Sequence, residues 1–375
     1  MKSPKIIWRI LIGSLLVLMA VPPVKLFYFA SGVRWLYILI FSFMGAYFFT
    51  PICRSLAFRL GILDRPGGRK IHQEPTPLLG GMAICLAFSL SLLLNGVFLP
   101  GMKIMLVGAA FIFFMGLWDD IRPLRPLVKL LLQILITLGV VVWGDIRLTF
   151  FTHYVWAPFI NIPLTVLWIV GLTNALNFFD GLDGLATGMS TITAFFLGMM
   201  AFESNQPALG WLAIALMGAC VGFLPFNLRI GKPALIFLGD AGSTFLGFTL
   251  AGLAVIGEWS VNSHFVSLTA PVLIFGVLIF DMLYVTLSRS RNSKSGNIMT
   301  LLMTPGRDHL HHRLLFMGFS AKEAAFTIFT VSACLGVSAL IIMDQNFIDA
   351  LLGLLQAALI LATIAIIMIK GRERA

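Results

Sequence analysis

Long apolar runs alternate with short polar loops along the whole chain, a pattern that predicts membrane-spanning helices. A helix needs roughly 20 apolar residues to cross the hydrocarbon core of a bilayer. We expect about 10–12 transmembrane helices in an all-α polytopic membrane protein. Twelve runs are visible: an N-terminal run that reaches Ala30, then 35–52, 79–100, 102–118, 127–144, 160–178, 186–203, 208–228, 235–256, 264–288, 325–343 and 346–369.

The N-terminal run follows the basic segment Met1–Arg9, as in a secretory signal peptide. No A-x-A-like cleavage site follows it, Leu18 and Ala20 being the nearest pair, so we predict a first membrane span. We treat the chain as one transmembrane domain. It comprises an N-terminal extra span (1–33), a core (34–325) and C-terminal spans (326–375).

Composition supports this fold class, because 59% of the 375 residues are hydrophobic and only 11% are charged. The mean hydropathy of +0.97 is too high for a water-soluble chain of this length. The four cysteines are far apart in sequence, and their spacing indicates neither a disulfide framework nor a metal knuckle.

The net charge of +10 is distributed in a way that indicates topology rather than nucleic-acid binding. If the N-terminus lies inside and the spans alternate, only four of the 26 Lys and Arg residues fall in outside loops. These are Lys25, Arg34, Lys103 and Arg147. The positive-inside rule then predicts that the other loops are cytoplasmic.

The most informative stretch is Thr173–Gly188, with the sequence TNALNFFDGLDGLATG. Polar residues follow one another at intervals of three, directly after a lipid-like apolar run: Asn174, Asn177, Asp180 and Asp183. A carboxylate at the bilayer centre costs roughly 2.5–3.5 kcal/mol, so such groups face a protein interior or a wet cavity. Solvation of a helix end is the alternative interpretation, and the number of polar residues favours a functional site.

Three further acids belong to the same predicted side, since Asp119 and Asp120 end one span and Asp240 opens another. Lys129 lies inside the next span. These acids predict a shared polar cavity, a bound cation, or both. Mg²⁺ prefers oxygen ligands, usually one or two carboxylates together with substrate phosphates. Phe237, three residues before Asp240, either stacks on a base or packs in lipid.

Two cytoplasmic loops carry groups that could hold a phosphate. The first contains Lys70 and His72, for which topology anchoring is the simpler interpretation. The longest loop contains a histidine-rich stretch with His309, His311, His312 and Arg313. These residues could bind zinc or hold a diphosphate through their positive charge. The absence of a nearby cysteine favours diphosphate binding.

The polar residues around that stretch also suggest local structure. We expect Asp308 to cap a short helix that ends before Gly318, and Ser320 with Glu323 to form a capping box. We expect Asp281, near the end of its span, to pair with Arg289 or Arg291.

Taken together, five motifs resemble those of the polyprenyl-phosphate N-acetylhexosamine-1-phosphate transferases, the family of bacterial MraY, WecA and TagO. The resemblance runs from about Pro51 to Ser320 and rests on these motifs in the family's order: RKIHQEPTPLLGG, the Asp119-Asp120 pair with Lys129, NALNFFDGLDG, FLGDAGS and HLHHR. The RKIH and H-x-H-H-R forms are similar to the WecA/TagO branch.

The resemblance implies an MraY-like helix bundle with its active site on the cytoplasmic face of the bacterial inner membrane. It implies transfer of a sugar 1-phosphate, GlcNAc-1-phosphate or a related N-acetylhexosamine, from a UDP-sugar to undecaprenyl phosphate, with release of UMP. Such a reaction initiates a cell-envelope polysaccharide such as O-antigen. The implied cofactor is Mg²⁺, with Mn²⁺ as a substitute, and a homodimer is left open.

From the residues and the resemblance together we predict three groups of site residues. The predicted catalytic residues are Asp119, Asp120 and Asp183, and the predicted metal ligands are Asn177 and Asp240. The predicted substrate-binding residues are Lys70, His72, Lys129, Asn174, Asp180, Phe237, His309, His311, His312 and Arg313. A transporter or channel is the rival function, but it predicts polar residues through the full depth of the spans.

One departure from the family pattern concerns the stretch between Asn227 and Asp240. It contains an insert-like segment, Leu228–Lys232, so the resemblance assigns Asn227 no firm role in nucleotide recognition.

Overall fold

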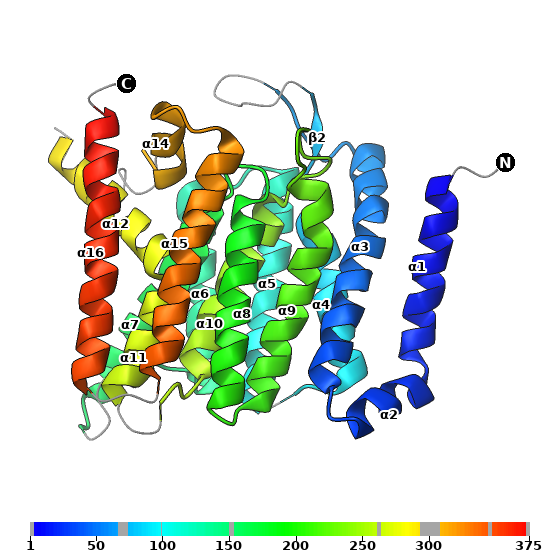
Figure 1. Cartoon of the computed structure of the whole chain (residues 1–375), viewed down its shortest axis with the longest axis horizontal. Helices are drawn as coiled ribbons and strands as arrows, with labels where there is room; N and C mark the ends of the chain where they lie inside the picture. The colour runs from blue at the N-terminus through cyan, green and yellow to red at the C-terminus, as the bar shows by residue number, and fades with distance from the viewer. Residues whose placement is uncertain are drawn as a thin grey trace.

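The computed structural model describes residues 4–66, 74–98, 100–149, 154–260, 264–292, 308–343 and 347–372 as a bundle of roughly parallel helices (Figure 1). In chain order the long helices and their neighbours are α1 (Pro4–Ala20), α2 (Pro22–Ala30), α3 (Arg34–Leu60), α4 (Gly80–Asn95), α5 (Pro100–Ile121), α6 (Pro126–Gly144), α7 (Ala157–Phe179), α8 (Leu185–Glu203), α9 (Pro207–Asn227), α10 (Gly239–Ile256), α11 (His264–Ile274), α12 (Gly276–Asn292), α14 (Leu310–Phe316), α15 (Ala321–Ile342) and α16 (Phe347–Arg372).

Within these ranges, nine helices are long and apolar enough to cross a membrane. Two bent pairs raise the number to eleven: α1 with α2, bent by 66°, and α11 with α12, bent by 75°. The one predicted run not counted among these eleven is 79–100, whose helix α4 is apolar but shorter than a membrane span. The predicted all-α polytopic architecture is therefore confirmed, with each apolar run appearing as a helix or a bent pair.

Three boundaries differ from the prediction. The N-terminal run is not one straight span, because the chain turns where Pro22-Pro23 begins α2. The run at 79–100 ends as a helix at Asn95, where Gly96 adopts a left-handed C-cap. The run at 235–256 becomes helical only at Gly239, because residues before it pair with another segment.

That segment is a short β-hairpin-like loop, in which β1 (Leu63–Asp64) pairs with β2 (Thr76–Pro77) in antiparallel register. The backbone N–H of Phe237 donates to the carbonyl of Pro77 at 2.8 Å. Gly80 in turn donates to the carbonyl of Phe237 at 3.0 Å. Apolar residues before α10 therefore satisfy their backbone groups in this pairing rather than in a helix.

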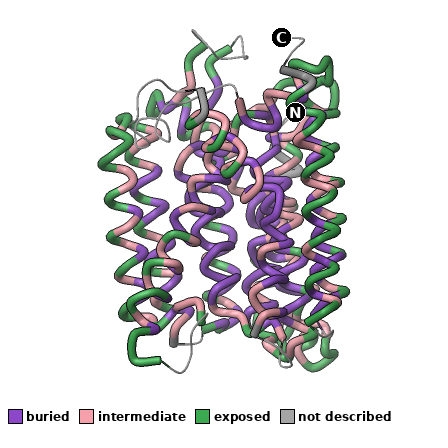
Figure 2. Tube along the Cα trace, turned by 90° about the vertical axis from the view of Figure 1, so that its left-hand side faces the viewer, coloured by how far each residue is buried: buried purple, intermediate pink, exposed green. Residues whose placement is uncertain are grey.

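Burial is concentrated on α10, where 89% of the apolar window is covered by protein. This helix packs against α4, α5, α7 and α8. By contrast, α6 and α16 are 22% and 17% buried over their windows and lie at the periphery. Figure 2 shows the same division, with buried segments in the middle and exposed ones outside.

The first residues of α1 and the last residues of α16 lie at one end of the bundle in Figure 1, together with α14 and β2. The C-terminal end of α5 and the N-terminal end of α10 reach this same end. We call it the site end, because the predicted chemical groups lie there.

Candidate active site

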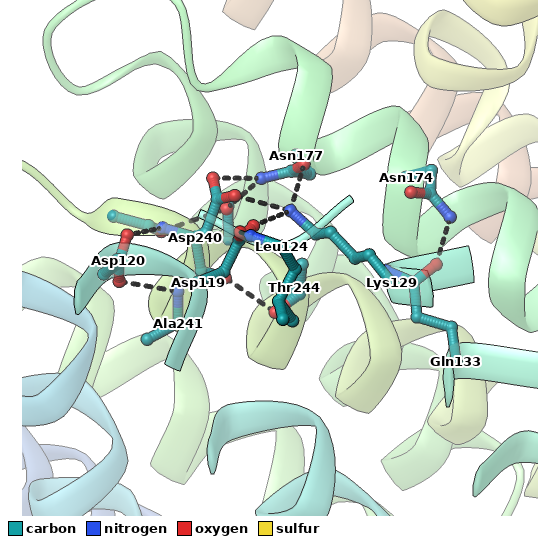
Figure 3. Close-up of polar contacts among 12 residues, drawn as sticks. Asp119, Asp120, Leu124, Lys129, Gln133, Asn174, Asn177, Asp240, Ala241 and Thr244 are labelled. Carbon is teal, nitrogen blue, oxygen red and sulfur yellow. Dashed lines mark hydrogen bonds and ion pairs between the residues drawn. The ribbon is translucent and has the colours of Figure 1, made fainter. Parts of the chain in front are cut away.

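Four predicted residues from four helices meet at the site end, around the ammonium group of Lys129 (Figure 3). Its Nζ lies 2.9 Å from Oδ2 of Asp119 and also bonds Oδ2 of Asp240. It further donates to Oδ1 of Asn177 at 3.4 Å, while Asn177 Nδ2 donates to Oδ1 of Asp240 at 2.9 Å. Residues more than a hundred positions apart thus form one connected polar cluster.

Local sequence explains how Lys129 enters this cluster. Pro126 begins α6 at a position where the missing N–H is harmless, and Lys129 follows in the first turn. The turn between α5 and α6 is fastened by the N–H of Leu124, which donates to Oδ1 of Asp119 at 2.7 Å. Asp119 consequently has both carboxylate oxygens engaged.

Asp120 has a different role in the structure, because its carboxylate caps the N-terminus of α10. Its oxygens accept the N–H groups of Asp240 and Ala241 at 2.8 and 3.0 Å. A carboxylate here satisfies orphan backbone donors and complements the helix dipole. Asp120 therefore fixes the helix end that carries Asp240 from the neighbouring α5.

The backbone just before Asp240 requires glycine. Gly239 has φ +76°, and a Cβ there would lie 2.4 Å from the carbonyl oxygen of Leu78. Only glycine adopts this conformation at no steric cost. The glycine that precedes the acid in the FLGDAGS motif thus lets α10 start against the loop.

The two amides of α7 share one face, as predicted. Asn174 Nδ2 donates to Oε1 of the buried Gln133 at 2.6 Å. One turn later, Asn177 also donates to Oγ of Ser243 at 2.8 Å. The polar layer between α6, α7 and α10 is therefore continuous, with Asn174 one turn deeper than Asn177.

Asp180 is half-buried just beyond the end of α7. Desolvation by burial, together with the negative charges of Asp240, Asp120 and Asp183, raises the pKa of Asp180 well above its usual value. Asp183 accepts the N–H of Ala234 at 2.9 Å and so fastens the loop before α10. Both acids of the DGLDG segment lie in the acidic region around Asp240.

The loop between α9 and α10, residues 228–238, is held from several sides. The buried Asn227 donates to the carbonyl of Ile236 at 3.0 Å, and Arg54 Nε donates to the carbonyl of Leu235 at 3.0 Å. Phe237 is half-buried on this loop. Asn227 thus has a structural role, since it pins the loop that leads to Asp240.

The histidine-rich segment packs beside the end of α7. The ring of His311 is 1% exposed, and neither ring nitrogen has a hydrogen-bond partner within the described residues. Burial, and then the charges of His312 and His309, lower the pKa of His311 well below its usual value. The ring lies against Gly181, where a Cβ would meet its Nε2 at 2.5 Å.

Two predicted pairings in this region are wrong. Asp308 is not a helix cap, because His309 is the N-cap of α14. The Asp308 carboxylate instead accepts hydrogen bonds from Nε and Nη2 of Arg289, at 2.6 Å each. Asp281 pairs with His309 rather than with Arg289, at 2.6 Å. The predicted capping box of Ser320 and Glu323 is confirmed.

The remaining predicted site residues are placed as follows. His312 and Arg313 are half-buried on α14, and Nε of Arg313 is enclosed without a partner within the described part of the chain. Lys70 and His72 lie outside the described residues.

The donor set fits a hard divalent cation. Lys129 is hydrogen-bonded to two of the acids at this end of the bundle, Asp119 and Asp240. Five carboxylates gather here: Asp119, Asp120, Asp180, Asp183 and Asp240. The side chain of Asp240 is 38% exposed, against 11% for Asp119, so Asp240 is the more open acceptor. The described residues contain no ready-made group of three His, Cys, Asp or Glu ligands. Mg²⁺ does not require such a group, because it commonly keeps several water ligands and binds the phosphates of the substrate.

Sequence reasoning missed two residues that shape the site, Ser243 and Arg54, and gave a third, Asp281, the wrong partner. Ser243 shares a helix face with Asp240, so the i, i+3 spacing was a usable signal. Asp281 is a lone acid in an apolar helix, which is a functional signal in its own right. Arg54, in the last two turns of α3, gave no local signal because its partner is 181 residues away.

Comparisons with known proteins agree with this geometry. The family model described as glycosyl transferase family 4 matches residues 102–258, which include the α5, α7 and α10 contributions to the cluster. A probable undecaprenyl-phosphate N-acetylglucosaminyl 1-phosphate transferase of Bacillus subtilis is 32% identical over 82% of this chain and 84% of its own length.

Two further relatives carry similar names. A decaprenyl-phosphate N-acetylglucosaminephosphotransferase of Mycobacterium tuberculosis is 35% identical, over 76% of each chain. An undecaprenyl-phosphate alpha-N-acetylglucosaminyl 1-phosphate transferase of Yersinia pestis is 27% identical over 79% of this chain and 81% of its own length. Together with the clustered motifs, these matches show that the chain belongs to glycosyl transferase family 4, among the polyprenyl-phosphate N-acetylglucosaminyl-1-phosphate transferases.

Proposed function

We propose that this protein transfers an N-acetylhexosamine 1-phosphate, GlcNAc-1-phosphate in the first instance, from a UDP-sugar to undecaprenyl phosphate. The observation that carries the proposal is the cluster of Asp119, Lys129, Asn177 and Asp240 at one end of a membrane bundle. The names of the relatives supply the substrate class. A polar site confined to one end gives no support to a transporter or channel.

The site end is proposed to face the cytoplasm of a bacterial inner membrane. Its loops carry most of the basic residues, as the positive-inside rule requires of cytoplasmic loops. This side is also where a sugar nucleotide is available. The lipid phosphate, anchored in the bilayer, reaches the same boundary from within the membrane.

The proposed cofactor is Mg²⁺, held by Asp240 and Asn177. When bound, such an ion neutralises diphosphate oxygens and aligns the donor. The residues that surround this position define the rest of the chemistry. Lys129 contributes positive charge between Asp119 and Asp240, and Arg313 offers an enclosed donor without a partner in the described chain.

The reaction is a phosphoryl transfer at the β-phosphorus of the UDP-sugar. An oxygen of the lipid phosphate forms a new bond to this phosphorus, the bond to the bridging α–β oxygen breaks, and UMP leaves. One phosphoanhydride replaces another, so no ATP is required. Such a step depends mainly on alignment and charge neutralisation.

Asp119 is proposed to position the nucleophile rather than to deprotonate it. A phosphate monoester has its second pKa near 6 and is mostly dianionic at neutral pH. Each Asp119 oxygen already accepts one hydrogen bond, Oδ1 from the N–H of Leu124 and Oδ2 from Lys129. A carboxylate so engaged serves best to hold Lys129 and the α5–α6 turn in place.

The direct test is release of UMP by the purified protein supplied with UDP-GlcNAc and undecaprenyl phosphate. We expect UMP only when Mg²⁺, lipid phosphate and an intact Asp240 are all present, and none from Asp240→Asn. A panel of UDP-GlcNAc, UDP-GalNAc and UDP-linked deoxy-N-acetylhexosamines identifies the preferred donor. UMP release that ignores the lipid phosphate would contradict the proposal.

A further inference from the structure

Asp281 is a buried acid on α12 that the proposed reaction does not use. It is 1% exposed, and its carboxylate is hydrogen-bonded to the N-terminal end of α14, at the N-cap His309 and the first helical residue Leu310. Oδ2 lies 2.6 Å from Nδ1 of His309, and Oδ1 accepts the N–H of Leu310 at 2.7 Å. An acid so deeply placed in an apolar helix requires partners of this kind.

The chemistry of this pair determines which nitrogen of His309 carries a proton. An ionised carboxylate can only accept hydrogen bonds, so Nδ1 must be the donor. The opposite nitrogen, Nε2, is then the ring atom left to meet a ligand. The tautomer of a histidine is commonly set in this way by the partner of its other nitrogen.

His309 is also connected to the site through ring contacts. Its ring lies 5.4 Å from that of Phe178, the neighbour of Asn177, and stacks at 6.0 Å and 14° on His311. His311 in turn lies against Gly181, between the two acids of the DGLDG segment. The ring of His309 therefore packs on the buried imidazole that lies against Gly181.

We propose that Asp281 is a positioning residue for the transfer reaction. Acting through His309, it fixes the tautomer and orientation of the paired imidazoles that face the diphosphate of the sugar nucleotide. The proposal rests on the proposed function, which supplies the diphosphate.

A purely mechanical anchor is the competing account, and the structure contains a matched control for it. Arg289, two turns after Asp281 on α12, holds Asp308 with two hydrogen bonds of 2.6 Å. This pair also connects α12 to the residues at the start of α14. None of the hydrogen bonds described for the pair involves the ring of His309. Weakening this pair tests anchoring alone.

The decisive variant is Asp281→Asn, which keeps the shape of the side chain. Its oxygen still accepts from Leu310, but its NH₂ group faces Nδ1 of His309 and drives the proton to Nε2. We expect kcat for UMP release to fall at least roughly tenfold while KM for the UDP-sugar changes less, as for a lost transition-state interaction. Arg289→Gln should lower the thermal stability and leave kcat within about twofold of wild type.

A double-mutant cycle shows whether the effect passes through the ring. In a His309→Gln background, Asp281→Asn should cause no further loss of kcat, because the two residues act as one unit. His309→Asn provides a second test that does not depend on the Asp281 variant folding. Its amide still donates to Asp281, so an anchor would survive while kcat falls to the same degree as in Asp281→Asn.

The tautomer itself has a readout independent of activity. The chain has six histidines, and ¹⁵N spectra of histidine-labelled protein, compared with those of His309→Gln, isolate His309. We expect protonated Nδ1 in the wild type and protonated Nε2 in Asp281→Asn. Wild-type kcat in Asp281→Asn, losses that multiply in the double mutant, or a wild-type Nε2–H tautomer would overturn the proposal. Absence of UMP release from the wild type would instead refute the proposed function and leave the tautomer measurement to decide.

Discussion

Asp119 shows how one hydrogen-bond pattern separates two mechanisms. Asp119 accepts from Leu124 through Oδ1 and from Lys129 through Oδ2, and these bonds stabilise the ionised carboxylate and make it a weaker base. We therefore predict that Asp119→Asn lowers activity by a similar factor at all pH values from about 5.5 to 8, a range that brackets the second pKa of the lipid phosphate. Rates across this range provide the measurement. Near-full activity above about pH 7 with loss only at low pH would establish a base instead.

Asp180 carries a stability cost that depends on pH. Because burial and neighbouring acids raise its pKa in the folded state, the folded protein binds this proton more tightly than the unfolded chain. The contribution of Asp180 to stability therefore falls as pH rises from its unfolded pKa through its raised folded pKa. Above that window the charged side chain destabilises the ligand-free protein.

We predict that Asp180→Asn raises the thermal unfolding temperature of the ligand-free protein by about 2 °C or more near pH 8. The gain should shrink as pH decreases, because wild-type Asp180 then becomes protonated. Thermal scans of both proteins across pH, without divalent cations, test this. An unfolding temperature for Asp180→Asn below that of wild type near pH 8 would contradict it.

At the residue scale, the sequence was informative where a charged or amide side chain occurs within or beside an apolar run. Asp240, Asn177 and Lys129 are costly in apolar helices, and the structure brings them together. Which acid bonds Lys129 and which caps a helix was not predictable, because these roles depend on backbone groups far away in the sequence. Asp120 was predicted to be catalytic, and the N–H groups that its carboxylate caps lie 120 residues away. That prediction of catalysis stays open.

At the scale of helices, α10 is positioned by close backbone contacts with its neighbours. A Cβ at Gly116 of α5 would lie 2.6 Å from the Cα of Ala241, and one at Gly81 of α4 would lie 2.3 Å from the Cα of Gly242. Small residues at such crossings let membrane helices approach closely. The first turn of α10, which carries Asp240, is therefore set by α4 and α5.

We predict that Gly116→Ala reduces UMP release at least roughly tenfold, because a one-ångström displacement of a catalytic group has effects of this size or larger. Gly171→Ala is the matched control, since its Cβ meets nothing within 4 Å in the middle of α7. That variant should retain wild-type activity. Equal activity in the two variants would show that the α5–α10 contact does not position the site.

The apolar runs predicted where helices occur, but they predicted only some of the positions at which helices bend or begin. Pro22-Pro23 marks the bend between α1 and α2 in the sequence. The start of α10 was placed too early, because Leu235–Leu238 is as apolar as a helix, while its backbone bonds to β2 and the segment after it rather than within a helix. Nonlocal pairing of this kind leaves no local signal.

At the scale of the whole molecule, a cytoplasmic active site requires that the two ends of the bundle face opposite compartments. Ile230, near the site end, is 90% exposed, and Val155, before α7 at the other end, is 95% exposed. In a background without native cysteines, we predict that Val155→Cys reacts with a membrane-impermeant thiol reagent in intact cells. Ile230→Cys should react only after permeabilisation, and the reverse pattern would refute the cytoplasmic site.

The most direct test of the central claim follows the β-phosphorus itself. UDP-GlcNAc labelled with ³²P at the β-phosphate is incubated with the purified protein, Mg²⁺ and undecaprenyl phosphate, and the lipid and aqueous phases are separated. If the sugar 1-phosphate is transferred as proposed, the label moves into the lipid phase in step with the release of unlabelled UMP, and Asp240→Asn abolishes both. Label remaining in the aqueous phase as UDP, with sugar alone transferred to lipid, would contradict the proposed transfer.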